Sequence, residues 1–147
     1  MRLISIMLAF LLLWATLLSA NDDKKTDAAE PLSWDLLKDV KTIEKDLMLV
    51  PQFGSDLEAL DGTEITLKGY MMPLDQAQTQ KNFILSANPV AGCYFCMPGG
   101  PETMVEVKAG KAVKFGYNPI KIRGTLELLR DDPMGMFYRL TDARLVE

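Results

Sequence analysis

The sequence predicts a mainly β domain: a small five-stranded antiparallel barrel of OB-like type, or a sandwich, with one N-terminal helix. Two observations predict this class. From residue 61 onward about five segments alternate apolar and polar side chains, whereas only one earlier segment has helical spacing. Two of the alternating segments contain a glycine in a similar context, Gly69 and Gly124, and glycines supply the bends that closing a small sheet requires. Many short strands with a single helix are typical of small barrels and sandwiches.

The helix is expected at residues 34–48. Ser33 is a suitable N-cap for a helix that begins at Trp34, and Asp35 lies in the first turn, near the positive end of the helix dipole. Pro51 and Gly54 then interrupt the pattern. The apolar residues that repeat at helical spacing are Leu36, Leu37, Val40, Ile43, Leu47 and Met48.

Strands are predicted at residues 65–70, 82–86, 104–108, 120–128 and 136–146. The clearest alternation is that of 120–128, which places Ile122 toward the core and Lys121 and Arg123 on the opposite, solvent-facing side. Residues 109–119 are too few and too rich in Gly and Pro for the helix that usually separates the third and fourth strands of an OB-fold. The expected shared core consists of Ile65, Leu67, Ile120, Ile122, Leu126 and Leu128, joined by Phe83 or Leu85 and Val105 or Val107, with Trp34, Leu37 and Val40 docking the helix.

The N-terminus has the features of a secretory signal peptide. Arg2 precedes an apolar run over residues 3–18, and Ser19-Ala20 provides a small-residue cleavage site before a charged segment. We expect a signal peptide at 1–20, a flexible tether at 21–32 and a single β-rich domain at 33–147, in a periplasmic or secreted protein. An uncleaved N-terminal anchor is the alternative. No cysteine lies near Ala20, so the sequence excludes a lipoprotein.

The charge balance bears on partners. The chain has 16 basic and 20 acidic residues, a net charge of −4, and no histidine. An acidic balance with no Lys/Arg cluster argues against nucleic acid and anionic lipid as partners, because both need a basic surface. We therefore expect no membrane contact beyond the signal peptide.

Several motifs together resemble a known family. They are D-G-T-E-I-T-L-K-G-Y-M-M-P-L at 61–74, N-F-I-L-S at 82–86 and C-Y-F-C-M-P-G-G-P at 93–101, with S-W-D-L-L at 33–37 and I-K-I-R-G-T-L-E-L at 120–128. This pattern is similar to a family of secreted or periplasmic bacterial proteins of unknown function. The resemblance implies a place in the cell envelope and an accessory role beside a metal-related ABC transport system, whose components would be the partners.

Cys93 and Cys96 are the only cysteines, and they form a C-x-x-C pair. Such a pair is a structural disulfide, a redox-active pair or half of a metal site. Pro98-Gly99-Gly100-Pro101 follows at once and cannot continue the helix that a thioredoxin-like motif opens, which disfavours the redox reading. A zinc site would need ligands beyond two cysteines. We expect an intraloop disulfide, which restricts the unfolded chain by only about 2 kcal/mol.

The disulfide would hold Tyr94 and Phe95 rigidly, with Met97 beside them, either as a contact surface for a protein partner or as a cap on the open end of the barrel. A Cu(I) site of Cys93, Cys96 and Met97, with Met71 or Met72, is the soft-ligand alternative. Most methionines here stand beside apolar residues in strands, where filling the core is their usual role.

The chain lacks the phosphate-binding loop, the dinucleotide-binding glycine motif and the nucleophile elbow. We interpret it as an exported, non-enzymatic binding or accessory module of the bacterial envelope that needs no cofactor. The alternative is a thiol-based redox protein or a Zn- or Cu-handling protein that uses Cys93 and Cys96. The pattern does not predict an oligomeric state.

Overall fold

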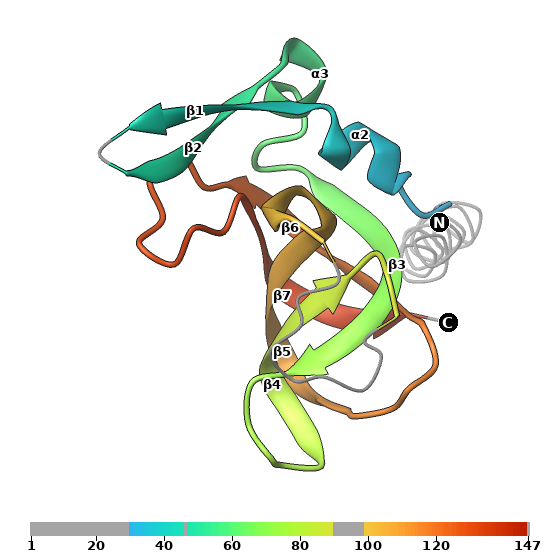
Figure 1. The fold of residues 1–147 in the computed structure, drawn as a ribbon. Helices are drawn as coiled ribbons and strands as arrows, with labels where there is room; N and C mark the ends of the chain where they lie inside the picture. Colours follow the sequence, from blue (N-terminus) through green and yellow to red (C-terminus); the bar gives the residue numbers. More distant parts are fainter. Residues whose placement is uncertain (1–29, 46, 90–98, 147) are drawn as a thin grey trace, which may run out of the picture.

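The centre of the molecule is a closed barrel of five strands, seen in a computed structural model that describes residues 30–45, 47–89 and 99–146 (Figure 1). The strands follow the order β3-β4-β5-β7-β6 around the barrel, and β6 pairs with β3 to close it. Within the described residues no helix is long and apolar enough to cross a bilayer. The strand bounds are β3 Glu64–Pro73, β4 Thr79–Ser86, β5 Met104–Lys114, β6 Ile120–Leu128 and β7 Tyr138–Val146.

Strand order and direction confirm the OB-like barrel and correct one detail of the prediction. Four of the five neighbouring pairs are antiparallel, but β5 and β7 are parallel. An odd number of strands cannot alternate in direction all the way round a closed ring, so a five-stranded barrel must contain a parallel pair. The sheet is therefore mixed, and the purely antiparallel prediction was wrong on this point.

The barrel interior is apolar and has the predicted register. Ile122, Leu67 and Leu126 are fully buried, and the core also takes both members of each pair that the sequence left open. These pairs are Phe83 with Leu85, and Val105 with Val107. Ile120 packs against this core but is only partly buried.

Arg123 departs from the expected pattern. Its exposed fraction is only 2%, although it lies on the face of β6 opposite to Ile122. Its Nε donates a 3.0 Å hydrogen bond to Oγ1 of Thr66, which is also buried. The outer face of the barrel is thus covered at this point, and the prediction of a solvent-facing Arg123 was wrong.

The region before the barrel differs most from the prediction. The helix α2 covers only Trp34–Lys38, with Ser33 as its N-cap, and is followed by a hairpin of β1 (Val40–Lys45) and β2 (Met48–Phe53) in place of the predicted helix over 34–48. Val40, Thr42 and Ile43 are β-branched and favour a strand, while Pro51 is tolerated because β2 is an edge strand. The apolar positions that suggested one helix are equally well spread over two short strands.

The N-terminal elements cover one end of the barrel. We call this the capped end; here β4 and β6 end, and β5 and β7 begin. The hairpin, α2 and α3 (Ser55–Glu58) lie there, above the barrel in Figure 1, and contribute Leu37 and Leu57 to the core. The N–H of Leu32 and Nε1 of Trp34 donate 2.8 Å hydrogen bonds to the carbonyls of Thr66 and Lys68, which fastens this region to β3. The loops at 74–78 and 115–119 form the opposite end.

Candidate functional site

Residues 90–98, which we call the cysteine segment, lie outside the described residues. This applies to Cys93 and Cys96, to the predicted contact residues Tyr94 and Phe95, and to Met97. The disulfide, the partner contact and the alternative zinc or copper site therefore stay predictions. Of the other soft ligands considered, Met71 is buried in the barrel core opposite Leu85, and Met72 is partly buried on the same strand.

The two flanks of that segment are described, and they lie side by side at the capped end. Ser86 at the end of β4 pairs with Met104 at the start of β5, and one step further the N–H of Ala87 donates to the carbonyl of Thr103 at 3.0 Å. The short 3-10 helix η1 (Pro101–Thr103) is closed by Thr103, whose N–H and hydroxyl both donate to the carbonyl of Gly100, at 2.9 and 2.8 Å. Ala87 and Thr103, the described residues on either side of the cysteine segment, are thus held next to each other.

Tyr138 holds α2 beside these flanking residues. Its hydroxyl donates a 2.6 Å hydrogen bond to the carbonyl of Leu37, the residue of α2 that enters the core, and its ring contacts that of Phe53 with centroids 5.7 Å apart. Burial raises the pKa of Tyr138 well above its usual value, and the negative charge of Glu102 in η1 raises it further. The phenol therefore stays protonated and keeps its role as donor.

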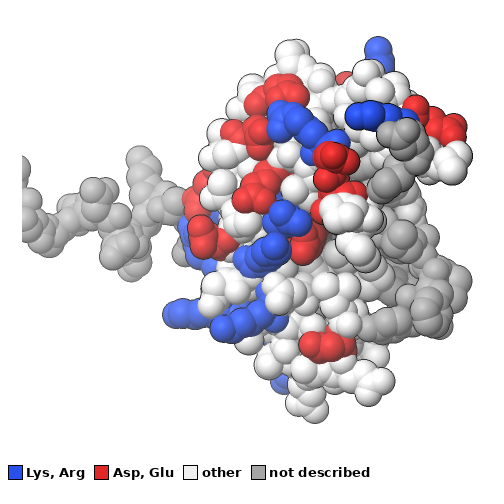
Figure 2. Space-filling model, turned by 90° about the vertical axis from the view of Figure 1, so that its left-hand side faces the viewer, with Lys and Arg blue, Asp and Glu red and all other residues white. Residues whose placement is uncertain are grey.

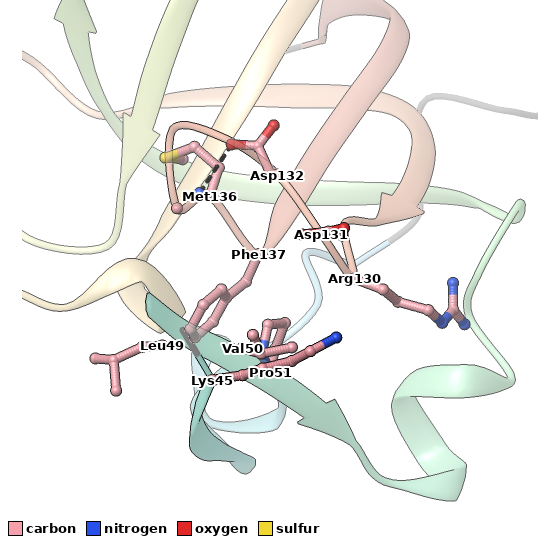
Figure 3. A pocket seen from close by; sticks show the side chains of 10 residues that line it. Lys45, Leu49, Val50, Pro51, Arg130, Asp131, Asp132, Met136 and Phe137 are labelled. Carbon is pink, nitrogen blue, oxygen red and sulfur yellow. Dashed lines mark hydrogen bonds between the residues drawn. The ribbon is translucent and has the colours of Figure 1, made fainter. Parts of the chain in front are cut away.

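A groove of about 200 Å³ lies between the β1–β2 hairpin and the connection from β6 to β7 (Figure 3). Both polar and apolar side chains line it. The hairpin supplies Lys45, Leu49, Val50 and Pro51, and the connection supplies Arg130, Asp131, Asp132, Gly135, Met136 and Phe137.

The β6–β7 connection is held by hydrogen bonds of Asp132. One carboxylate oxygen of Asp132 accepts from the N–H groups of Met134 and Met136, at 2.9 and 3.1 Å, and its carbonyl accepts from the N–H of Gly135 (Figure 3 shows the bond to Met136). The other carboxylate oxygen lies 3.7 Å from Nη2 of Arg139. This carboxylate therefore shapes the wall of the groove.

The guanidinium of Arg130 forms ion pairs with two carboxylates that do not line the groove. Its guanidinium binds Glu58 at 2.5 Å and Asp61 at 3.2 Å, and these hydrogen bonds, first that of Asp61, raise its pKa further. In Figure 3 its side chain extends away from Lys45, Val50 and Pro51. The groove is therefore lined by Leu49, Val50 and Pro51 of the hairpin, with Lys45 and Asp131 as exposed charges beside them.

Comparison with known proteins identifies the family. The sequence profile of a family described as "Protein of unknown function (DUF3299)" matches residues 14–145. The chain belongs to the DUF3299 family. This confirms the resemblance to a family of unknown function that the motifs indicated. Among curated proteins, none is significantly similar to this chain.

The fold agrees with that of a DUF3299 protein of known structure. The chain is similar to the crystal structure of a DUF3299 family protein from Pseudomonas aeruginosa PAO1, with a TM-score of 0.51 and 25% sequence identity. The similarity covers 66% of this chain and 68% of that one. Membership in the family is thus supported by both the sequence match and the structural similarity.

Several apolar side chains of the hairpin and of the β6–β7 connection are exposed in this DUF3299 protein, and one of them, Leu49, lines the groove. Leu47 at the hairpin turn is 93% exposed, Leu49 56% and Ile43 44%, and Met134 on the β6–β7 connection is 84% exposed. Ile43 and Leu47 fitted the apolar stripe of the helix that the sequence predicted over 34–48. The run of β-branched residues around Ile43 was the signal that could have located the hairpin.

Proposed function

We propose that this DUF3299 protein is an exported, non-enzymatic binding or accessory module of the bacterial envelope, and that its capped end receives a protein partner. The observation that carries the proposal is the group of exposed apolar side chains of the hairpin beside the groove, above all Leu47 and Leu49. The expected signal peptide and the family resemblance support the envelope location, and components of a metal-related ABC transporter are the partners that the resemblance suggests.

The hairpin suits binding because its base is fixed while its tip is exposed. Pro51 is buried and Phe53 packs against Tyr138, so the ribbon is already ordered before a partner arrives. Preformed structure reduces the entropy lost on association. Complete burial of a Leu, Ile or Met side chain contributes about 1.5–3 kcal/mol, so a few of them can form the centre of an interface.

The chemistry of the groove indicates the kind of segment it would take. An apolar side chain of the partner would lie on Leu49, Val50 and Pro51, while Lys45 and Asp131 offer one charge of each sign at the sides. Ala87 and Thr103, which flank the cysteine segment, lie at the same end, and the partner contact predicted for Tyr94 and Phe95 is part of the same proposal.

Site-specific photo-crosslinking tests the proposal. A photoreactive amino acid would replace Leu49 or, as a control of nearly equal exposure on the barrel wall, Leu145, in the full chain produced in its own cells; these side chains are 56% and 53% exposed. We expect a discrete adduct from position 49 and none from position 145, with the yield at 49 reduced by Leu47→Ser. Equal adducts from both positions, or none from position 49 in a folded protein, would overturn the proposal.

A further inference from the structure

The opposite end of the barrel is basic, although the chain as a whole is acidic. Residues 76–86 and 107–121 contain five lysines and no Asp or Glu, in a chain with 20 acidic residues. Such segregation of charge produces a local positive potential that the net charge of −4 hides. Figure 2 shows acidic and basic side chains interleaved over the upper part of its view, and fewer, mostly basic ones in the lower part.

The fold brings these lysines together. Thr79 pairs with Lys114 and Asn82 with Lys108, so Lys81 on β4 lies beside the stretch of β5 that carries Lys111. We call Lys81, Lys108, Lys111 and Lys114 the lysine cluster. All four side chains are exposed, and within the described part of the chain none of them forms an ion pair.

Two carboxylates lie in the neighbourhood and do not cancel this charge. Asp75, in the β3–β4 loop, accepts hydrogen bonds from the N–H of Ala77 and from Nε2 of Gln80, which lower its pKa and keep it ionised. Asp142 is exposed on β7, next to Ala143, which pairs with Ala109 of β5. The four positive charges of the lysine cluster are therefore opposed by only these two carboxylates, Asp75 in the β3–β4 loop and Asp142 on β7.

Two exposed apolar side chains project from the loops of the same end. Leu74 is 54% exposed and Tyr117 is 86% exposed. The N–H of Phe115 donates to the carbonyl of Gln78 at 2.9 Å, so the two loops are joined, and the ring of Phe115 supports that of Tyr117 at a centroid distance of 5.2 Å.

We propose that this end docks on an anionic phospholipid surface. Lysines on flexible stems attract a diffuse negative surface without the fixed fork that arginine offers a single carboxylate or phosphate. Tyrosine is enriched at membrane interfaces, and Leu74 would enter the boundary of the acyl chains beside it. Loops at one end of a barrel can touch a plane together, with the capped end turned toward a protein partner. The sequence shows no basic cluster, because Lys81 and the lysines of β5 come together only when β4 and β5 pair.

Vesicle binding tests this with protein from its own cells that lacks residues 1–20, because the apolar run over residues 3–18 would itself enter a bilayer. The probes are vesicles of equal parts phosphatidylcholine and phosphatidylglycerol, and vesicles of phosphatidylcholine alone. We expect binding to the first only, and loss of binding as salt rises from about 0.05 to about 0.5 M, because screening shortens the reach of the lysine charges. Lys111→Gln/Lys114→Gln should weaken binding about 30-fold, since each lysine near an anionic surface is worth about one factor of five to six.

The matched control is Lys38→Gln/Lys41→Gln, which removes two exposed lysines of α2 and β1 from the capped end and should leave vesicle binding unchanged. Tyr117→Ala/Leu74→Ala should lower binding without changing its salt dependence. Equal binding to both kinds of vesicle, equal loss in the two lysine variants, or binding to soluble polyphosphate or an acidic protein but not to vesicles would each overturn the proposal. The crosslinking at Leu49 is unaffected by any of these outcomes, so the two proposals fail separately.

Discussion

The hydroxyl of Tyr138 and the main-chain carbonyl of Leu37 form a 2.6 Å hydrogen bond between residues 101 positions apart in the sequence. Both residues are fully buried. The bond joins the first residue of β7 to α2 and so fixes the N-terminal region on the capped end, next to the residues that flank the cysteine segment. The geometry of the proposed partner surface therefore depends on a contact in the core.

Tyr138→Phe should destabilise the protein by about 1–3 kcal/mol. The substitution keeps the ring and its contact with Phe53 but leaves the buried carbonyl of Leu37 without this donor. Urea unfolding followed by circular dichroism measures the change. Tyr117→Phe is the control, because that side chain is 86% exposed and its hydroxyl can bond water in either state. Equal stability of the two variants would contradict the role assigned to the bond.

The same residue predicts a dependence of stability on alkaline pH. Burial, with a smaller effect of Glu102, raises the pKa of Tyr138 above its ordinary value of 10.0 in the folded protein. The unfolded chain then loses this proton first, so the contribution of Tyr138 is complete below pH 10 and decreases as the pH rises further. Between about pH 9 and about pH 11, the stability difference between the protein and Tyr138→Phe should narrow by about 1 kcal/mol. A difference that stays constant over this interval would show that the two states share one pKa.

Gly69→Ala should be destabilising by about 1–3 kcal/mol because there is no room for a side chain. A Cβ at this position would lie 2.5 Å from the carbonyl oxygen of Ser86 and 3.2 Å from the ring of Trp34. Here β3 leaves β6, its partner up to Gly69, and begins to pair with β4 at Tyr70. Gly116→Ala, where a Cβ meets nothing within 4 Å, is the control and should be neutral or slightly stabilising. Thermal unfolding of both variants distinguishes a local steric effect from a general cost of replacing glycine.

The barrel could be predicted from the sequence because its signals are local. Alternation over 120–128 fixes which face of β6 is buried, and Gly69 and Gly124 mark positions where strands change neighbours or shift register. The parallel pairing of β5 with β7 has no local signal, since it follows from the closure of the ring. The burial of Arg123 also depends on what covers the outer face, which periodicity does not report.

The candidate surfaces were less predictable than the core. The hairpin could not be recognised because the spacing of Val40, Ile43 and Leu47 fits one helix as well as it fits a hairpin. Whether the tip of a hairpin is buried depends on tertiary contacts, which the spacing does not report. The lysine cluster joins Lys81 with lysines about thirty residues later in the sequence, so a scan along the chain finds no basic run. In both cases the missing information was the pairing of strands.

Ile122→Asp should destabilise the protein by several kcal/mol, because the side chain is fully buried in the barrel and would place an unpaired charge there. Ile43→Asp makes the same chemical change on the outer face of the hairpin, where the residue is 44% exposed, and should cost far less. Denaturant unfolding of the two variants measures the difference. A small effect at Ile122 would overturn the register of β6, and a large one at Ile43 would show that the hairpin is buried in solution.

The disulfide predicted between Cys93 and Cys96 lies outside the described residues, but the residues that flank the cysteine segment are described and held together. Because Ala87 and Thr103 already close the base of the segment, a disulfide there would order only the loop between them. In protein purified from the exporting compartment we expect no free thiols before reduction and no stoichiometric zinc or copper by elemental analysis. The reduction potential should lie below about −300 mV, whereas a value near −120 to −180 mV would indicate an oxidoreductase.

Cys93→Ser/Cys96→Ser should keep the fold, lose at most about 2 kcal/mol of stability and weaken the crosslink at Leu49. Metal bound to reduced thiols, or complete loss of function with an intact crosslink, would instead establish the redox or metal-handling alternative.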